Sequence, residues 1–227
     1  MVLVAVGALA AIAYGSTSSN TPAAPSAPSA AISATGSTGK AQPPQPGLAR
    51  RLPGDPLALG KTDAPVVLIE WAEFQCPFCG RFARDTQPAL IDKYVRSGTL
   101  RIEWRDFPYL GPESTTAALA ARAAAAQGKF WPYHDALFAH QFPPNSGHLT
   151  DAYLVGIAKT LGLNIARFQV DMNSPATKQA VEKDFLQGQN LGVTGTPSFL
   201  VNSTPIVGAQ PLSVFENAIE QAAAQAK

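Results

Sequence analysis

The residues best suited to chemistry are the chain's only two cysteines, which stand in the segment Cys76-Pro77-Phe78-Cys79. This segment follows the apolar run Val66–Phe74, which predicts a buried strand, and it opens a stretch with a helical pattern. Two thiols at this spacing at a helix start can close a small disulfide ring without distorting the first turn. Pro77 suits that turn because the position needs no backbone donor. The sequence therefore predicts a redox-active pair at a strand-to-helix junction.

The sulfur of Cys76 needs more than its place at a helix start to become reactive. A thiolate there would face unpaired N–H groups and the positive end of the helix dipole. A free thiol with a pKa of ~8.5 is only about 3% ionised at neutral pH, and lowering that pKa to ~5 requires roughly 5 kcal/mol. The dipole contributes about 0.3–1 kcal/mol and at most ~2. We expect direct hydrogen bonds to the sulfur to supply the rest, including one from Cys79.

Two other uses of the cysteine pair are less well supported. A zinc half-site would need further ligands, but the chain has no second CxxC, and His134, His140 and His148 have no recognisable ligand spacing to the pair. A structural staple would close a very short loop, which stabilises by roughly 2 kcal/mol, against ~4–5 kcal/mol for a loop of ~100 residues. A redox function fits the pair better than either.

The composition excludes several classes of protein. The chain has 227 residues, of which 46% are hydrophobic, and a formal net charge of +1. This balance does not suit a protein that binds phosphates by releasing counterions, so we expect no nucleic-acid partner. Two cysteines cannot build a disulfide-rich scaffold. The length suits one domain with tails.

The N-terminal region has the pattern of targeting and linker sequence. Residues Val2–Tyr14 are uncharged and nearly all apolar, too few for the ~20 residues of a bilayer-spanning helix but suitable for a signal-peptide core of ~7–15. The first basic residue is Lys40, so we expect residues 1–14 to be a signal peptide or a membrane anchor truncated at its N-terminus. Residues 15–52 are rich in Ser, Ala and Pro, which predicts a disordered tether. We expect Arg50-Arg51 to be a solvated pair.

Residues 53–227 carry the patterns of a folded domain. The first three predicted elements form a strand–helix–strand unit with a right-handed parallel crossover. They are the strand Val66–Phe74, a helix from Pro77 with a kink at Pro88, and a second strand over the alternating residues Thr99–Arg105. The remaining predicted elements are helices over Glu113–Gln127, Phe130–His140, Leu154–Leu161 and Pro175–Leu191, strands over Ser198–Val201 and Pro205–Val207, and a last helix with Leu212, Phe215, Ile219 and Ala222 on one face. This order predicts an α/β fold with a mixed central sheet. A helical insertion, at about residues 110–191, separates its βαβ and ββα halves.

The sequence resembles the DsbA-like branch of the thioredoxin superfamily, the thiol:disulfide oxidoreductases of bacterial cell envelopes. The resemblance runs from about Leu57 to the C-terminus and implies a thioredoxin-like fold for residues 53–227. It rests on the strand and Cys76-Pro77-Phe78-Cys79, on Trp131-Pro132-Tyr133-His134-Asp135-Ala136-Leu137-Phe138, on Gly192-Val193-Thr194-Gly195-Thr196-Pro197, and on Val207-Gly208-Ala209 with Phe215. A lone CxxC is weak evidence, whereas CxxC followed by a distant Thr-Pro before a strand is strong evidence.

This resemblance implies roles for individual residues. Cys76 would be the exposed attacking thiolate, and Cys79 the buried resolving thiol. Thr196-Pro197 would form a loop with a cis peptide bond against the active-site sulfurs. Because proline offers no N–H, the backbone of Thr196 would be free to pair with an extended substrate by strand addition.

Two acids and Phe78, the residue before the second cysteine, complete the expected site. Glu70 lies inside the apolar strand, where the family commonly places a buried acid. Burial would raise its pKa and let it exchange protons with Cys79 through water; the alternative is an acid at a polar sheet margin. Glu73 is expected to be solvated. Phe78 stands where strong oxidants of the family often carry His, and it cannot donate to a thiolate, so we expect a reduction potential between about −120 and about −270 mV.

The aromatic residues near the cysteines allow two interpretations. Trp71, Phe74, Phe78 and Phe107 either form an apolar rim around the cysteine pair, suited to unfolded polypeptides, or belong to the core. His134 is expected to be a packing or surface residue and not a ligand.

These features predict an extracytoplasmic oxidoreductase, membrane-tethered or secreted, that introduces or exchanges disulfides in exported proteins. It would use the Cys76–Cys79 pair and need no organic or metal cofactor. The expected partners are exported unfolded or reduced polypeptides and an integral-membrane protein that re-oxidises the pair, and we expect a monomer. An isomerase or reductase for envelope proteins is an alternative. A binding or chaperone-like module with an inert disulfide is another.

Overall fold

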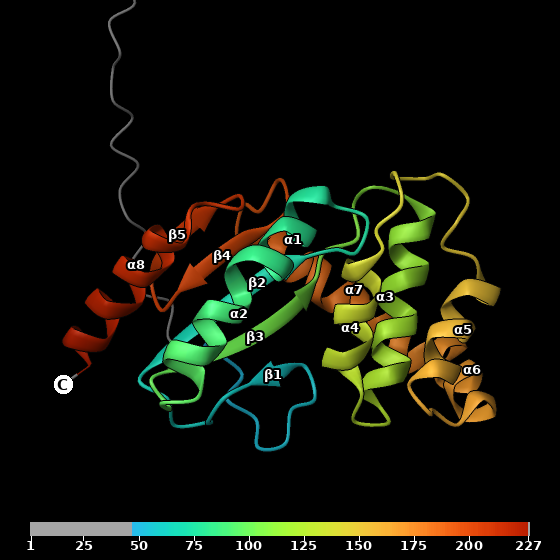
Figure 1. Ribbon diagram of the computed structural model, residues 1–227, viewed down its shortest axis with the longest axis horizontal. Coiled ribbons are helices and arrows are strands. Elements are labelled where there is room, and N and C mark those ends of the chain that lie inside the picture. The colour runs from blue at the N-terminus through green and yellow to red at the C-terminus, as the bar shows by residue number, and fades with distance from the viewer. Residues whose placement is uncertain (1–46, 227) are drawn as a thin grey trace, which may run out of the picture. The chain divides into compact units, whose positions relative to one another are not determined.

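A five-stranded mixed sheet lies at the centre of the computed structural model, which describes residues 47–226 (Figure 1). The sheet has the order β1-β3-β2-β4-β5. Its strands are β1 (Ala58–Leu59), β2 (Val66–Ala72), β3 (Leu100–Asp106), β4 (Ser198–Val201) and β5 (Thr204–Val207). Strands β2 and β3 are parallel, whereas the other pairs are antiparallel. All residues of β2 are buried, as its apolar, β-branched sequence predicts for a central strand.

The active-site helix crosses from β2 to β3 in four consecutive segments. These are α1 (Pro77–Arg81), the π-helical η1 (Phe82–Thr86), α2 (Gln87–Leu90) and the π-helical η2 (Ile91–Val95). Pro88 cannot donate a backbone hydrogen bond and crowds the preceding turn. The irregularity predicted at Pro88 takes the form of π turns on either side of α2, and the Gln87 N–H bonds to the Phe82 carbonyl five residues back.

A helical insertion lies between β3 and β4, beside one end of the sheet (Figure 1). It comprises α3 (Pro112–Ala125), α4 (Phe130–Ala139), α5 (Asp151–Thr160), α6 (Ile165–Asn173) and α7 (Pro175–Asn190), and α8 (Leu212–Gln225) closes the chain. The predicted helix at Pro175 begins with a cap, since the Ser174 hydroxyl accepts from the Thr177 N–H at 3.1 Å. The predicted α/β fold with its insertion is likewise confirmed.

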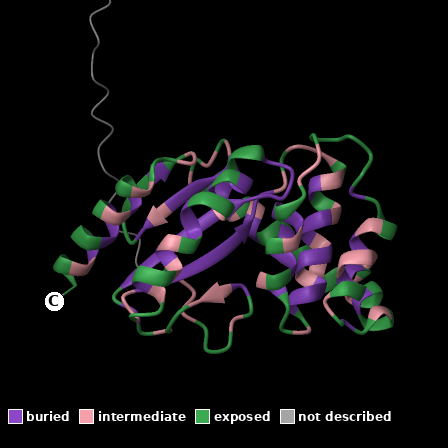
Figure 2. Cartoon of the chain, viewed as in Figure 1, coloured by how far each residue is buried: buried purple, intermediate pink, exposed green. Residues whose placement is uncertain are grey.

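Three apolar clusters hold these layers together, and Figure 2 shows that buried residues fill the central strands and the inward sides of the helices. On one face, Leu68 and Ile102 pack with Phe82 of the active-site helix and Phe215 of α8. On the other face, the cluster of Val67, Ile69, Trp71 and Phe107 packs against Phe185 and Leu191 near α7. The third cluster joins Cys76 and Cys79 to the insertion. The cysteines therefore lie where the sheet, the active-site helix and the insertion meet.

The segment just before residue 53 binds to the sheet through charged groups. The backbone N–H groups of Arg50 and Arg51 donate to the two oxygens of the buried Glu103 carboxylate, at 2.8 and 2.9 Å. The Arg50 guanidinium also pairs with the buried Asp184 of α7. The prediction of a solvated Arg50-Arg51 pair is therefore wrong, because the buried acids need donors and this segment supplies them. Residues 1–14 and most of the predicted tether lie outside the described residues.

Candidate active site

The cysteine motif begins α1. Cys76 is the N-cap residue with extended backbone angles, and Pro77 takes the first helical position. Both cysteines are free thiols, and their exposed fractions are 2% for Cys76 and 0% for Cys79. The expectation of an exposed Cys76 is therefore wrong in this structure. Its sulfur is covered by the loop before β4, since its thiol donates to the carbonyl of Thr196 at 3.2 Å.

The sheet brings this loop to the cysteines. Strand β4 pairs with β2 so that Ser198 lies opposite Trp71. Residues just before β4 are therefore beside the turn that leaves β2, although they are far away in the sequence. The Thr196-Pro197 peptide bond is cis, which confirms the prediction from the resemblance.

The two thiols have opposite pKa shifts. The pKa of Cys76 is lowered from 9.0 to about 6, chiefly by a hydrogen bond from Cys79. Burial opposes this shift, while the Thr196 side chain and the backbone N–H groups of Phe78 and Cys79 add to it. Burial and the neighbouring Cys76 raise the pKa of Cys79. The two shifts give one thiol that is mostly ionised at neutral pH beside one that is not.

Two buried carboxyl groups lie under this pair. Glu70 is 0% exposed, and neither of its carboxylate oxygens has a hydrogen-bond partner within residues 47–226. Burial, followed by the charge of Cys76, raises the pKa of Glu70 to about 8. The predicted buried acid is confirmed, and the alternative of a polar sheet margin is wrong.

Glu73 is also buried, at 2% exposure, so the expectation of a solvated acid is wrong. Strand β2 ends at Ala72, and the insertion covers the turn that follows. The neighbouring Gln75 shows this cover directly, because its amide donates to the Ser114 hydroxyl of α3 at 2.8 Å. Burial raises the pKa of Glu73 to about 8. No local sequence signal distinguishes this acid from a solvated one, since the covering residues come from a distant helix.

The aromatic residues divide between the two interpretations. Trp71, Phe74 and Phe107 are buried and belong to the core, whereas Phe78 is 51% exposed beside the cysteines. Of the four residues considered for an apolar rim, only Phe78 is exposed. His134 is buried among aromatic rings, with its ring centre 4.7 Å from that of Phe138, which confirms a packing role.

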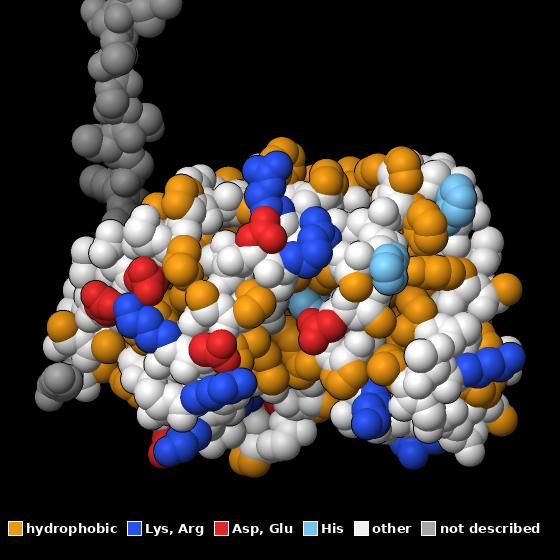
Figure 3. Space-filling view, in the orientation of Figure 1, with side chains coloured by type: hydrophobic (Ala, Val, Ile, Leu, Met, Phe, Trp, Pro, Cys, Tyr) orange, Lys and Arg blue, Asp and Glu red, His pale blue; other side chains and the backbone are white. Residues whose placement is uncertain are grey.

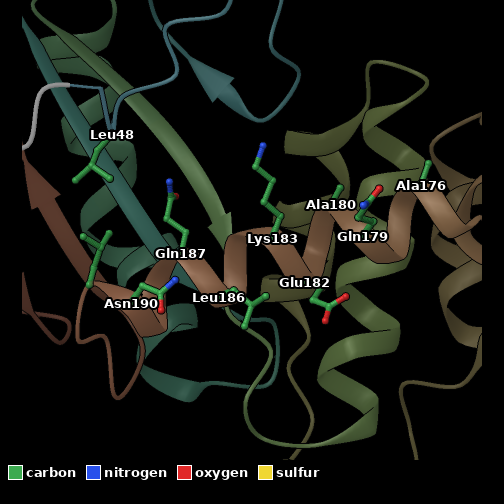
Figure 4. A pocket seen from close by; sticks show the side chains of 10 residues that line it. Leu48, Ala176, Gln179, Ala180, Glu182, Lys183, Leu186, Gln187 and Asn190 are labelled. Carbon is green, nitrogen blue, oxygen red and sulfur yellow. The ribbon is translucent and has the colours of Figure 1, made fainter.

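Two grooves in the described part of the chain lie away from the sulfurs. One, of about 980 Å³, follows α7 and includes Leu48 and Lys183 (Figure 4). The other, of about 600 Å³, lies between the active-site helix and α4, where Figure 3 shows apolar side chains in a hollow. Neither groove is lined by the cysteines or by Thr196-Pro197. These two grooves are therefore separate from the cysteine pair.

Comparison with known proteins agrees with this geometry. Residues 53–221, which contain the cysteine motif and the cis-proline loop, match the profile of the thioredoxin family. The chain belongs to the thioredoxin family. This thioredoxin-family protein is 32% identical over 149 residues to the probable disulfide bond formation protein D of Bacillus cereus. The matched region covers 64% of this chain and 69% of that protein. It is structurally similar to oxidised BdbD from Bacillus subtilis, with a TM-score of 0.70 and 26% identity, covering 75% of this chain and 94% of that one.

A second group of relatives consists of larger proteins. The chain is 34% identical over 170 residues to the Na(+)/H(+) antiporter NhaA 3 of Salinispora tropica, covering 74% of this chain and 25% of the antiporter. The thioredoxin-family protein thus spans about a quarter of the length of that relative. Within residues 47–226, no helix is both long and apolar enough to span a bilayer. With its Cys76–Cys79 pair, the protein is a DsbA/BdbD-like thiol–disulfide oxidoreductase.

Proposed function

We propose that this oxidoreductase works outside the cytoplasm and introduces or exchanges disulfides in exported proteins. The observation that carries the proposal is the asymmetry of the two thiols, with the pKa of Cys76 lowered to about 6 and that of Cys79 raised. A thiol of low pKa is a good leaving group, which favours the transfer of a disulfide to a substrate. The similarity to disulfide bond formation protein D and BdbD supports the same direction.

The exchange follows from the roles we assign to the two sulfurs. A substrate thiolate attacks the sulfur of Cys76 in the oxidised pair, a mixed disulfide forms, and the Cys76–Cys79 bond breaks with its electron pair on Cys79, which takes up a proton. A second substrate thiolate attacks the substrate sulfur of the mixed disulfide and releases the Cys76 thiolate. The substrate gains one disulfide, and two electrons pass to the cysteine pair.

Glu70 is proposed to exchange the proton of Cys79, directly or through water. Its carboxyl group is buried in the strand that leads to the cysteines, and its pKa of about 8 keeps a proton available near neutral pH. A carboxyl group of ordinary pKa would be ionised there and would oppose the thiolate on Cys76.

Substrate polypeptide is proposed to bind across the cis-proline loop. Pro197 presents no N–H, so an extended peptide can pair with the backbone of Thr196 while its cysteine meets Cys76. The exposed ring of Phe78 offers an apolar contact at the same edge. Movement of the peptide against this loop would also uncover the Cys76 sulfur.

The cellular setting is part of the proposal. The apolar run Val2–Tyr14 supports a signal peptide or membrane anchor. The Ser-, Ala- and Pro-rich composition of residues 15–52 supports a tether that ends before the sheet-bound Arg50-Arg51 segment. An integral-membrane redox partner would re-oxidise the pair after each transfer. We propose that the protein acts as a monomer.

The proposal is tested by supplying two forms of a multi-cysteine protein to the oxidised chain. We expect fast disulfide formation in the fully reduced form and slow rescue of a scrambled form. The Cys76→Ser variant should be inactive. Cys79→Ser cannot form the disulfide of the pair, but its Cys76 thiolate should attack the disulfides of the scrambled form and accumulate as a mixed disulfide with it. Faster rescue of the scrambled form would favour an isomerase, and failure with both forms would favour an inert module. The potential of the pair in a glutathione buffer should lie between about −120 and about −270 mV.

A further inference from the structure

A side chain of the helical insertion holds the turn that carries Cys76. Gln141 follows α4, and its Nε2 donates to the carbonyl oxygens of Phe74 and Cys76, both at 3.0 Å. These carbonyls flank the turn between β2 and α1. One amide group from the insertion therefore fixes both ends of the segment that leads to the attacking sulfur.

The orientation of this amide is itself fixed by Arg84. Arg84 Nη1 donates to Gln141 Oε1 at 3.2 Å and to the Phe138 carbonyl at 2.6 Å. Because the guanidinium group is a donor only, it selects the amide rotamer in which oxygen faces Arg84. The NH₂ group must then face the two carbonyls of the cysteine turn.

Gly80 provides independent evidence that this contact is built into the sequence. A Cβ atom at Gly80 would lie 1.8 Å from Gln141 Oε1 and 2.5 Å from its Cδ. Gly80 lies inside α1 and does not have a positive φ, so the backbone conformation does not require glycine. Glycine is unfavourable inside a helix. The close approach of Gln141 is the structural reason for its presence.

We infer that Gln141 is a positioning residue for thiol–disulfide exchange, because it fixes the peptide groups that set the place of the Cys76 sulfur at the start of α1. The inference rests on the proposed attack by Cys76. The Cys76 carbonyl accepts from both Gly80 N–H, at 3.1 Å, and Gln141. Two donors on this oxygen reduce the repulsion between its partial negative charge and a thiolate on the same residue. They also hold the sulfur where the N–H groups of the first turn can reach it.

The test is the pH dependence of Cys76 alkylation in the reduced full chain. Gln141→Leu removes the donor without adding charge. Gly80→Ala keeps the Gln141 residue but pushes its side-chain amide away from the two carbonyls. Both variants should raise the pH midpoint of alkylation by about one unit. Gln169→Leu, at an exposed position on α6, is the matched control and should leave the midpoint unchanged.

The outcomes separate this inference from the proposed function. A wild-type midpoint near 8.5 would reject the activated Cys76 itself. A low wild-type midpoint that neither variant changes would overturn the role of Gln141 and leave the proposed function intact. A loss of thermal stability without a change of midpoint would also overturn it, because Gln141 would then be only a structural residue.

Discussion

Replacing Glu70 with glutamine should stabilise the protein, and increasingly so as the pH rises. Burial raises the pKa of Glu70 from 4.5 to about 8. Below pH 4.5 the carboxyl group is protonated in both the folded and unfolded states, so it has no effect on the pH dependence. Above it, the unfolded chain releases the proton and the folded chain does not. Each pH unit then lowers the free energy of unfolding by about 1.4 kcal/mol, which amounts to about 3 kcal/mol at pH 7.

The assay is urea denaturation of the reduced wild type and of Glu70→Gln at pH 4.5 and at pH 7.5. Taking the difference between the two proteins removes the contributions of Glu73 and Cys76, to the extent that they titrate alike in both. Glu182→Gln, at an exposed position on α7, is the control and should show no gain at either pH. A difference between wild type and Glu70→Gln that is the same at both pH values would refute the reasoning, because it would mean that Glu70 ionises normally in the folded state.

Three further substitutions test other parts of the structure. Burial opposes ionisation of Glu103, but hydrogen bonds from Arg101 and Arg105 lower its pKa to about 2. Glu103→Gln should therefore reduce the free energy of unfolding at pH 7. Urea titrations should show that this loss shrinks as the pH falls from 4.5 towards 2. A Cβ at Gly188 would lie 2.8 Å from the rings of Phe107 and Trp71, so Gly188→Ala should lower the free energy of unfolding by about 1–3 kcal/mol, and an unchanged melting temperature would contradict this packing. Phe78→His adds a donor beside the Cys76 thiolate and should make the pair more oxidising in a glutathione buffer; an unchanged or more reducing potential would show that residue 78 does not interact with the sulfur.

The elements around the cysteines were predictable because local patterns determine them. Strand β2 is apolar apart from Glu70, and the Ser174-Pro175 pair marks the start of α7 through its cap. The cysteine motif at the junction of strand and helix identified the site. Helix α6 was not predicted, since only Phe168 and Met172 are buried on it and most of its surface is polar.

The environment of the site was less predictable, because it depends on contacts between distant segments. The burial of Glu73 and of the Cys76 sulfur results from cover by the insertion and by the loop at Thr196. The role of Arg50-Arg51 depends on a buried acid of β3 that a sequence pattern does not distinguish from a solvated one. Gln141 has no motif, and only the folded chain brings it to the cysteine turn.

The central claim is that the fold makes one sulfur of the pair far more acidic than the other. The most direct measurement is the ultraviolet absorbance of thiolate in the reduced protein, followed from acid to alkaline pH with Cys76→Ser and Cys79→Ser in parallel. We predict one thiolate that forms with a pKa of about 6 and depends on Cys76, and a second that forms only well above pH 9. Two thiolates that form together near pH ~8.5 would contradict the account.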